Sequence, residues 1–368
     1  MTLGLGCVAG LGLLELIVRL FLPYNTPDTV RRHSLQYLPS AFARHRLAPD
    51  QTLTTAGAWG RRPGGGEDDR AFRINERGYR GAPIETPKPP GTVRIVVLGG
   101  SSVFDINASE GHDWPHLAQE MLRTMGHPGV EVINAGVPGH ATGDSLGRLY
   151  SQIWMYEPDY VLVYGAWNDM KYMGALDPGH PLIEVVPPYD PRADPFQNYR
   201  GLLDRVLCHS QIYVKLRNRH FLRRLEPGIE GARGAVPAQS SPVAWGLRQY
   251  RLNLDLLVDG SRDIGAIPLL ITEATLVAPG NGPGEKARIH YEYQSMDHDA
   301  LIGAFQDLYR AVREVGRDKN VAVLDLAARL NGRPELFEDQ VHTTPLGSRT
   351  IAAEVAEFLN KVMDRNAP

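Results

Sequence analysis

The stretch RIVVLGGSSVFD, from Arg94 to Asp105, decides the fold. A run of branched apolar residues leads directly into two glycines and then two serines. Such an apolar run is typical of a strand that is buried on both faces of a sheet. The glycines allow a tight turn, which suits a phosphate-binding loop, an inert turn or the seat of a nucleophile. The rest of the chain has to distinguish these three alternatives.

Four more apolar runs of the same kind follow along the 368-residue chain, over 130–134, 160–165, 267–272 and 321–326. Segments with a helical pattern alternate with them, over 114–125, 144–156, 245–264, 297–317 and 346–362. Strands that alternate with helices predict βαβ units, so we expect a three-layer α/β/α domain with a five-stranded parallel sheet. In the last helix, Thr344 is the expected N-cap and Pro345 the first helical residue.

Three parts of the chain lack this alternation. Residues 3–22 form a mostly apolar run of the length that crosses a bilayer, so we expect a transmembrane helix as a membrane anchor over 1–23, although Glu15 and Arg19 interrupt it. Residues 24–92 are rich in proline, glycine and arginine and predict an irregular connector. The α/β domain then covers 93–365, with an insertion at about 171–242 that we interpret as a lid or subdomain.

The overall composition excludes several classes of protein. The formal net charge is −3, so no basic surface indicates nucleic acid as a partner. The two cysteines are too few for a disulfide framework, and no Cys/His spacing is of the zinc type. Gly99-Gly100-Ser101-Ser102 lacks the glycine spacing and the lysine of phosphate-binding loops. We therefore expect no cofactor and no metal.

The ends of the predicted strands carry the polar residues of interest, because ligands of parallel sheets bind beyond the carboxyl ends of the strands. Ser101 follows the first strand, NAGVPG (Asn134–Gly139) the second and GAWND (Gly165–Asp169) the third. An acid and a histidine, Asp339 and His342, come immediately before the last helix. A serine, an amide, an acid and a histidine are the components of acyl transfer: nucleophile, oxyanion donor, orienting group and base.

In this order the motifs resemble the four blocks of the SGNH hydrolases, also called GDSL-type esterases. Gly99-Gly100-Ser101 corresponds to the first block, although Gly100 stands where the family usually has an aspartate. Gly136 matches the second block, Gly165–Asn168 the third and Asp339–His342 the fourth. The resemblance covers roughly 92–363 without the insertion, and it implies the flavodoxin-like fold of that family.

The resemblance also implies a role for each matching residue. Ser101 would be the nucleophile, His342 the general base and Asp339 the acid that orients the histidine. The oxyanion hole would consist of the Ser101 N–H, the Gly136 N–H and the Asn168 side-chain amide. Ser102, next to the nucleophile, is the alternative serine.

The function implied is that of a carboxylic ester hydrolase, an esterase or O-acyl/O-acetyl esterase acting on an acylated small molecule or glycan. Two alternatives stay open: an O-acetyltransferase that uses the same triad on a polysaccharide, and an inactive SGNH-like protein for glycan binding or assembly. Anchored members of the family often act on exported polysaccharides, so we expect a single-pass membrane protein whose catalytic domain is extracytoplasmic, in the periplasm or at the cell surface.

Three further features each allow two interpretations. Glu273 follows the fourth strand and either faces the pocket or has a structural role. His290 and His298 either line the mouth of the pocket or belong to a solvated loop. The basic stretch Arg217–Arg224 is either a solvated helix face or a surface for lipid headgroups or an anionic glycan.

Overall fold

The computed structural model describes residues 2–21, 37–38, 40–54, 71–172, 207, 210–213, 215–217, 219, 244–294 and 296–365. The predicted insertion at about 171–242 lies almost entirely outside these residues. Two compact units divide the chain, one over 1–36 and 186–236 and the other over 37–185 and 237–368. The second unit contains the sheet.

The five predicted strands form one parallel sheet, which confirms the expected α/β fold. They are β5 (Val93–Gly99), β6 (Val130–Gly136), β7 (Tyr160–Tyr164), β8 (Ile267–Ile271) and β9 (Val323–Leu324). Their order in the sheet is β6-β5-β7-β8-β9, and all neighbours pair in parallel. This is the doubly wound order of flavodoxin-like sheets, in which the carboxyl ends of all strands share one edge. In β5 the side chains of Ile95–Leu98 are at most 1% exposed, as expected for a strand covered on both faces.

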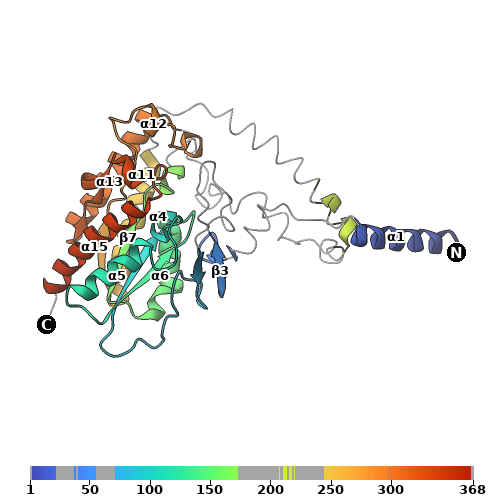
Figure 1. The fold of residues 1–368 in the computed structure, drawn as a ribbon, viewed down its shortest axis with the longest axis horizontal. Coiled ribbons are helices and arrows are strands. Elements are labelled where there is room, and N and C mark those ends of the chain that lie inside the picture. Colours follow the sequence, from blue (N-terminus) through green and yellow to red (C-terminus); the bar gives the residue numbers. More distant parts are fainter. Residues whose placement is uncertain are drawn as a thin grey trace. The chain divides into compact units, whose positions relative to one another are not determined.

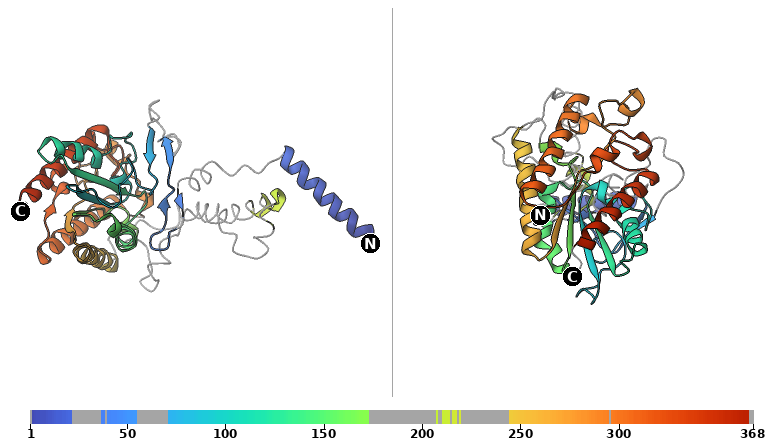
Figure 2. Two further views of the ribbon diagram at one scale, coloured as in Figure 1. Left: turned by 90° about the horizontal axis from the view of Figure 1, so that it is seen from below. Right: turned by 90° about the vertical axis from the view of Figure 1, so that its left-hand side faces the viewer.

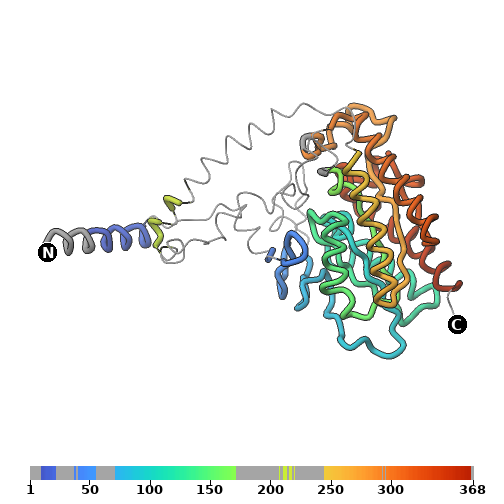
Figure 3. Tube along the Cα trace, turned by 180° about the vertical axis from the view of Figure 1, so that it is seen from behind, coloured from blue at the N-terminus to red at the C-terminus, as the bar shows by residue number. Residues whose placement is uncertain are grey.

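Helices cover both faces of the sheet (Figures 1 and 2). Helices α5 (Trp114–Thr124) and α15 (Pro345–Arg365) pack against each other on one face. On the other face lie α6 (Thr142–Ser151), α11 (Ala244–Asp263) and α13 (His298–Asp318), which are seen from behind in Figure 3. The predicted cap of the last helix is confirmed, because Thr344 Oγ1 accepts a hydrogen bond from Gly347 N at 3.1 Å.

Shorter elements connect these layers. The α-helical turns are α4 (Ser101–Phe104), α12 (Pro283–Lys286) and α14 (Leu326–Leu330). The 3₁₀ turns are η1 (Ile153–Tyr156), η2 (Asp169–Tyr172), η3 (Tyr291–Tyr293) and η4 (Pro334–Leu336). The helix predicted over 144–156 is thus α6 followed by a separate 3₁₀ turn. Helix α4 begins two residues after the end of β5, and Ser101 is its first residue. The two glycines and two serines after β5 therefore form the start of a helix and not an inert turn.

The prediction of an irregular connector over 24–92 is wrong for the described residues from 37 onward. These residues belong to the same compact unit as the sheet. They form β1 (Tyr37–Leu38), β2 (Arg46–Leu47), β3 (Gln51–Thr54) and β4 (Ala71–Ile74), paired as two antiparallel hairpins. Their apolar side chains share a small core with Phe104 of α4 and Val137 after β6; its members are Tyr37, Leu47, Phe72, Ile74, Phe104, Ile106 and Val137. Strands of two to four residues are too short to show a period in the sequence.

The first unit contains helix α1 (Thr2–Phe21). Glu15 and Arg19 form the expected i,i+4 ion pair at 2.8 Å. Glu15 also accepts hydrogen bonds from Ser210 Oγ at 2.8 Å and from the N–H of Gln211 at 2.7 Å. Within the described residues, no helix has the length and apolar character needed to cross a membrane, so the predicted anchor is not supported.

Candidate active site

Ser101, His342 and Asp339 lie together as the sequence predicts. His342 Nε2 is 2.8 Å from Ser101 Oγ, and His342 Nδ1 is 2.7 Å from Asp339 Oδ2. A carboxylate can only accept hydrogen bonds, so Nδ1 carries the ring proton and Nε2 is left to accept from the serine hydroxyl. A serine, a base and an orienting acid in this chain of hydrogen bonds are the arrangement that activates a hydroxyl as a nucleophile.

The loop Asp339–His342 is built around the carboxylate. Asp339 Oδ1 accepts hydrogen bonds from the backbone N–H of Val341 at 3.1 Å and of His342 at 2.9 Å. Burial alone would raise the pKa of Asp339, but the charge of His342 and these hydrogen bonds hold the pKa below its ordinary value. Asp339 therefore stays ionised at neutral pH and keeps the imidazole in the tautomer that the serine needs.

Two glycines bring the nucleophile helix close to the loop after β7. A Cβ on Gly99 would lie 2.1 Å from the backbone oxygen of Tyr164, and a Cβ on Gly100 would lie 2.6 Å from Asn168 Nδ2. No side chain fits at either position without displacing its neighbour. At residue 100, where the family that the motifs resemble usually has an aspartate, a side chain would require the amide of Asn168 and the carbonyl of His140 to shift.

Two of the three predicted oxyanion donors are available. Ser101 is the first residue of α4, so its N–H has no partner within the helix. Asn168 Nδ2 donates one hydrogen to His140 O at 2.9 Å, and its other hydrogen meets no acceptor among the residues that the structure describes. The Gly136 prediction is wrong, because the Gly136 N–H donates to Asn134 Oδ1 at 3.0 Å. A Cβ at Gly136 would also meet the backbone of α4, with Phe104 N at 2.2 Å, so its glycine serves close packing.

The same loop contains a donor that the sequence analysis missed. Gly139 lies next to His140, whose carbonyl contacts Asn168, and it has a left-handed backbone with φ of 86°. Within the described part of the chain, its N–H donates no hydrogen bond. NAGVPG contains two glycines, and the second one stands closer to the start of helix α6 at Thr142. This position is the signal in the sequence that points to Gly139.

The hairpin of β1 and β2 holds this loop in place. Arg44 donates from Nε to Asp144 Oδ2 at 2.9 Å and also reaches the carbonyl of Gly139. His45 Nε2 donates to the carbonyl of Pro138 at 3.0 Å. Burial would raise the pKa of Asp144, but His140 and Arg44 hold it below its ordinary value. Residues that the sequence placed in a connector therefore fix the loop that carries Gly139.

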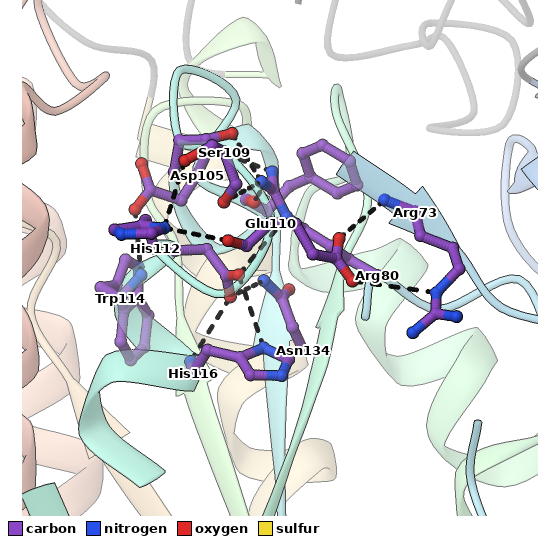
Figure 4. Close-up of polar contacts among 12 residues, drawn as sticks. Arg73, Arg80, Asp105, Ser109, Glu110, His112, Trp114, His116 and Asn134 are labelled. Atoms are coloured by element: carbon purple, nitrogen blue, oxygen red, sulfur yellow. Dashed lines mark hydrogen bonds and ion pairs between the residues drawn. The ribbon is translucent and has the colours of Figure 1, made fainter. Parts of the chain in front are cut away.

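Arg80 lies among the residues that follow the nucleophile helix, close to Asp105 and Ser109 (Figure 4). Its guanidinium donates to the carbonyls of Phe104 at 2.9 Å and Asp105 at 3.0 Å, at the C-terminal end of α4, and to those of Ala108 and Ser109. The side chain is fully buried and pairs with Asp113, 3.5 Å away. A charge buried this deeply needs such a set of partners. No motif around residue 80 reveals this role in the sequence.

The other candidates lie elsewhere or have structural partners. His298 contacts Tyr291 Oη at 2.9 Å and the carbonyl of Ala278 at 3.1 Å, so it ties together a loop. His290 donates from its backbone to Gln340, and no bond joins it to Ser101. The stretch Arg217–Arg224 falls almost entirely outside the described residues. Among the residues that are described, no three side chains gather as ligands for a metal ion.

Comparison with known proteins finds similarity only at the level of structure. No family model matches the chain, and no curated protein matches it. The lipase/acylhydrolase from Enterococcus faecalis is 18% identical, with 73% of this chain and 96% of that chain covered and a TM-score of 0.43. The native aryl esterase of M. smegmatis is 13% identical, covering 73% and 99%, with a TM-score of 0.43. A putative lipolytic protein of the G-D-S-L family from Desulfitobacterium hafniense is 12% identical, covering 73% and 99%, with a TM-score of 0.41.

Proposed function

We propose that this chain is a serine hydrolase of the SGNH type that cleaves a carboxylic ester. One observation carries the proposal: Ser101 Oγ, His342 and Asp339 form a continuous hydrogen-bonded triad with distances of 2.8 and 2.7 Å. Ser101 lies 241 residues before His342 in the sequence. A chance alignment of a hydroxyl, an imidazole and a carboxylate in this order is therefore improbable. The triad also lies at the carboxyl edge of the sheet, where ligands of such folds bind.

The chemistry proceeds in two steps of acyl transfer. Ser101 Oγ attacks the ester carbon while His342 Nε2 takes its proton, and the same proton then passes to the leaving alcohol. Asp339 stabilises the imidazolium that forms in between. A water molecule, deprotonated by His342, then attacks the acyl-enzyme, which releases the carboxylic acid and restores the Ser101 hydroxyl.

The oxyanion of each tetrahedral intermediate would be bound by the Ser101 N–H and the free amide hydrogen of Asn168. We propose Gly139 N–H as the third donor in place of Gly136. Arg44 and His45 hold the backbone on either side of Gly139, which keeps that donor fixed as charge develops. Fixed donors cost no reorganisation during the reaction, and removing one of them typically lowers turnover by about 10²–10³-fold.

The finer parts of the proposal concern the substrate and the location. An O-acyl or O-acetyl ester of a carbohydrate and an extracytoplasmic catalytic domain both follow from the family resemblance of the four motifs. A screen of acetylated sugars and short acyl esters tests the first. Surface labelling of intact cells that produce the protein tests the second.

The test of the proposed function compares two adjacent serines. Ser101→Ala removes the attacking oxygen and should lower kcat/KM for p-nitrophenyl acetate by at least about 10⁴-fold. Ser102→Ala is the matched control, because it deletes the same hydroxyl one residue later and should retain activity to within about tenfold. Activity that survives in Ser101→Ala, or disappears only in Ser102→Ala, would contradict the assignment.

A further inference from the structure

Glu273 is a buried carboxylate that the mechanism above does not use. It follows β8 at the same edge of the sheet as Ser101, and it is 2% exposed. Its Oε1 accepts a hydrogen bond from Ser102 Oγ at 2.5 Å. Its Oε2 accepts two more, from the backbone N–H of Ala166 and of Trp167, both at 2.6 Å.

These three donors belong to two different parts of the active site. Ser102 is the neighbour of the nucleophile on α4, whereas Ala166 and Trp167 immediately precede Asn168 in the loop after β7. One carboxylate therefore joins the segment that carries Ser101 to the segment that carries the oxyanion donor Asn168. The two segments also touch directly at Gly100, where no side chain could be added.

The position of Glu273 is itself fixed from outside. Tyr309 Oη donates to the backbone carbonyl of Glu273 at 2.8 Å, and the following residue, Ala274, donates its N–H to Tyr164 Oη at 3.2 Å. On the far side of the loop, Gln294 Nε2 donates to the carbonyl of Trp167 at 2.6 Å. The loop that carries Asn168 is thus held through both the N–H and the carbonyl of Trp167.

We propose that Glu273 is a positioning residue, which sets the separation of Ser101 and Asn168 by holding Ser102 and the N–H groups of Ala166 and Trp167 on one carboxylate. The proposal rests on the proposed function, since it concerns the oxyanion hole of that reaction. Residue 100 is a glycine and has no side chain that could link the two segments. The carboxylate of Glu273, which follows β8, provides that link.

The chemistry of a carboxylate suits this task. Two backbone N–H groups and a hydroxyl all need an acceptor, and a buried N–H without one costs about 1–3 kcal/mol. Burial raises the pKa of Glu273, while the hydrogen bonds from Ser102, Trp167 and Ala166 oppose that rise. A glutamine can keep the same three contacts, because its oxygen accepts from the two N–H groups and its amide donates to Ser102 Oγ.

The first experiment compares Glu273→Met with Glu273→Gln. Methionine fills the same volume but accepts none of the three bonds, so we expect kcat for p-nitrophenyl acetate to fall about 10²-fold with KM within about threefold. Glutamine should restore kcat to within about tenfold of the unmodified enzyme. Equal kcat values in Glu273→Met and the unmodified enzyme, or equal losses in both variants, would overturn the proposal.

The second experiment tests whether Glu273 acts through Asn168. In an Asn168→Ala background the donor is gone, so Glu273→Met should add less than about threefold to the loss in kcat. A residue that merely stabilised the fold would act independently, and the two losses would multiply. Multiplication of the losses would therefore contradict the proposal, while a shared loss supports it.

Asp325→Asn is the matched control. Asp325 also follows a strand of the sheet and accepts from a hydroxyl and a backbone N–H, those of Thr272 and Ala328, but it contacts neither Ser101 nor the loop with Asn168. We expect its kcat to stay within about threefold of the unmodified enzyme. A loss as large as that of Glu273→Met would show that any such carboxylate matters equally, and would overturn the proposal.

Ser102→Ala keeps the test available if Glu273→Met does not fold. It cuts only the link to α4, so we expect kcat to fall by about three- to tenfold in the unmodified enzyme and by no further factor in Asn168→Ala. An equal loss in both backgrounds would overturn the positioning role. A chain that hydrolyses no ester in a Ser101-dependent way would contradict the proposed function itself, which separates that failure from this one.

Discussion

Two regions far apart in the chain support the nucleophile helix by different kinds of contact. The loop Asp339–His342 reaches Ser101 with side chains, through one short bond between the carboxylate and the imidazole and a second between the imidazole and the serine hydroxyl. The two hairpins, β1 with β2 and β3 with β4, and the residues next to them contribute cationic donors to backbone carbonyls, as Arg80 does for Phe104. The first region performs proton transfer and depends on the identity of each residue. The second region fixes where the backbone lies, through the number and direction of the hydrogen bonds that its side chains donate.

The broadest expected effect concerns residues 37–69, which carry β1, β2 and β3 of the second region. A chain that lacks residues 1–36 keeps both hairpins and should retain kcat/KM for a small ester to within about threefold. A chain that lacks residues 1–69 loses Arg44, His45 and two buried members of the small core around Phe104, Tyr37 and Leu47. Since misplacing catalytic groups by about 1 Å can cost about 10²-fold, we expect a loss of at least that size.

The activities of the two purified deletion variants, lacking residues 1–36 and 1–69, are compared in a steady-state assay with p-nitrophenyl acetate. Full activity of the shorter chain would mean that the hairpins are dispensable, and the boundary predicted near residue 93 would then describe the functional domain after all.

The next effect concerns a single atom in the first region. In Asp339→Asn, the side-chain oxygen should stay on the N–H groups of Val341 and His342, so the amide faces His342 Nδ1 as a donor. The imidazole proton then has to sit on Nε2, where it blocks transfer from Ser101. We expect kcat to fall by about 10³–10⁴-fold. Raising the pH should not restore it, because a neutral histidine still has the wrong tautomer.

A pH–rate profile of the variant between pH 6 and 9 provides the measurement. Asp297→Asn is the control, because Asp297 caps α13 by accepting from the Ala300 N–H and contacts no residue of the triad. Recovery of the Asp339→Asn rate at high pH would show that Asp339 acts only through its charge.

The smallest effect tests the residue at which the two regions meet. Asp105 follows α4, receives the Thr343 hydroxyl at 2.8 Å, and has its carbonyl bound by Arg80. Burial raises its pKa from the ordinary 3.8 to about 6, against the hydrogen bonds of Ser348 and Thr343 and the charge of Arg80. A carboxyl group with a raised pKa stabilises the fold below pH 4, and that stability is lost as the pH rises through about 6.

Asp105→Asn should therefore lose the part of the pH-dependent stability that comes from the titration of Asp105. Between pH 4 and 7 the free energy of unfolding of the variant should fall by about 1–3 kcal/mol less than that of the unmodified protein. Asparagine also tolerates the left-handed backbone at this position, where φ is 57°. Urea unfolding at several pH values gives the comparison, and parallel curves for the two proteins would contradict the role of Asp105.

The same contrast explains which parts could be predicted from the sequence. The five strands, the main helices and the grouping of Ser101, Asp339 and His342 were predictable, because continuous apolar runs mark buried strands and because a serine after the first strand and an acid and a histidine before the last helix occur in a recognisable order. Arg80 was not, since an arginine that binds carbonyls 24 residues away leaves no local pattern. The sequence predicts Gly136 and misses Gly139, because it does not reveal that the Gly136 N–H is taken by Asn134 Oδ1.

The central claim is that Ser101 is an activated nucleophile, and covalent labelling tests it most directly. The purified chain is treated with a fluorophosphonate, which phosphonylates only an activated serine, and the modified peptide is identified by mass spectrometry. The account predicts a single adduct on Ser101 that is absent in Ser101→Ala and forms far more slowly in Asp339→Asn. An adduct on Ser102, or ester hydrolysis by a chain in which Ser101 stays unlabelled, would contradict it.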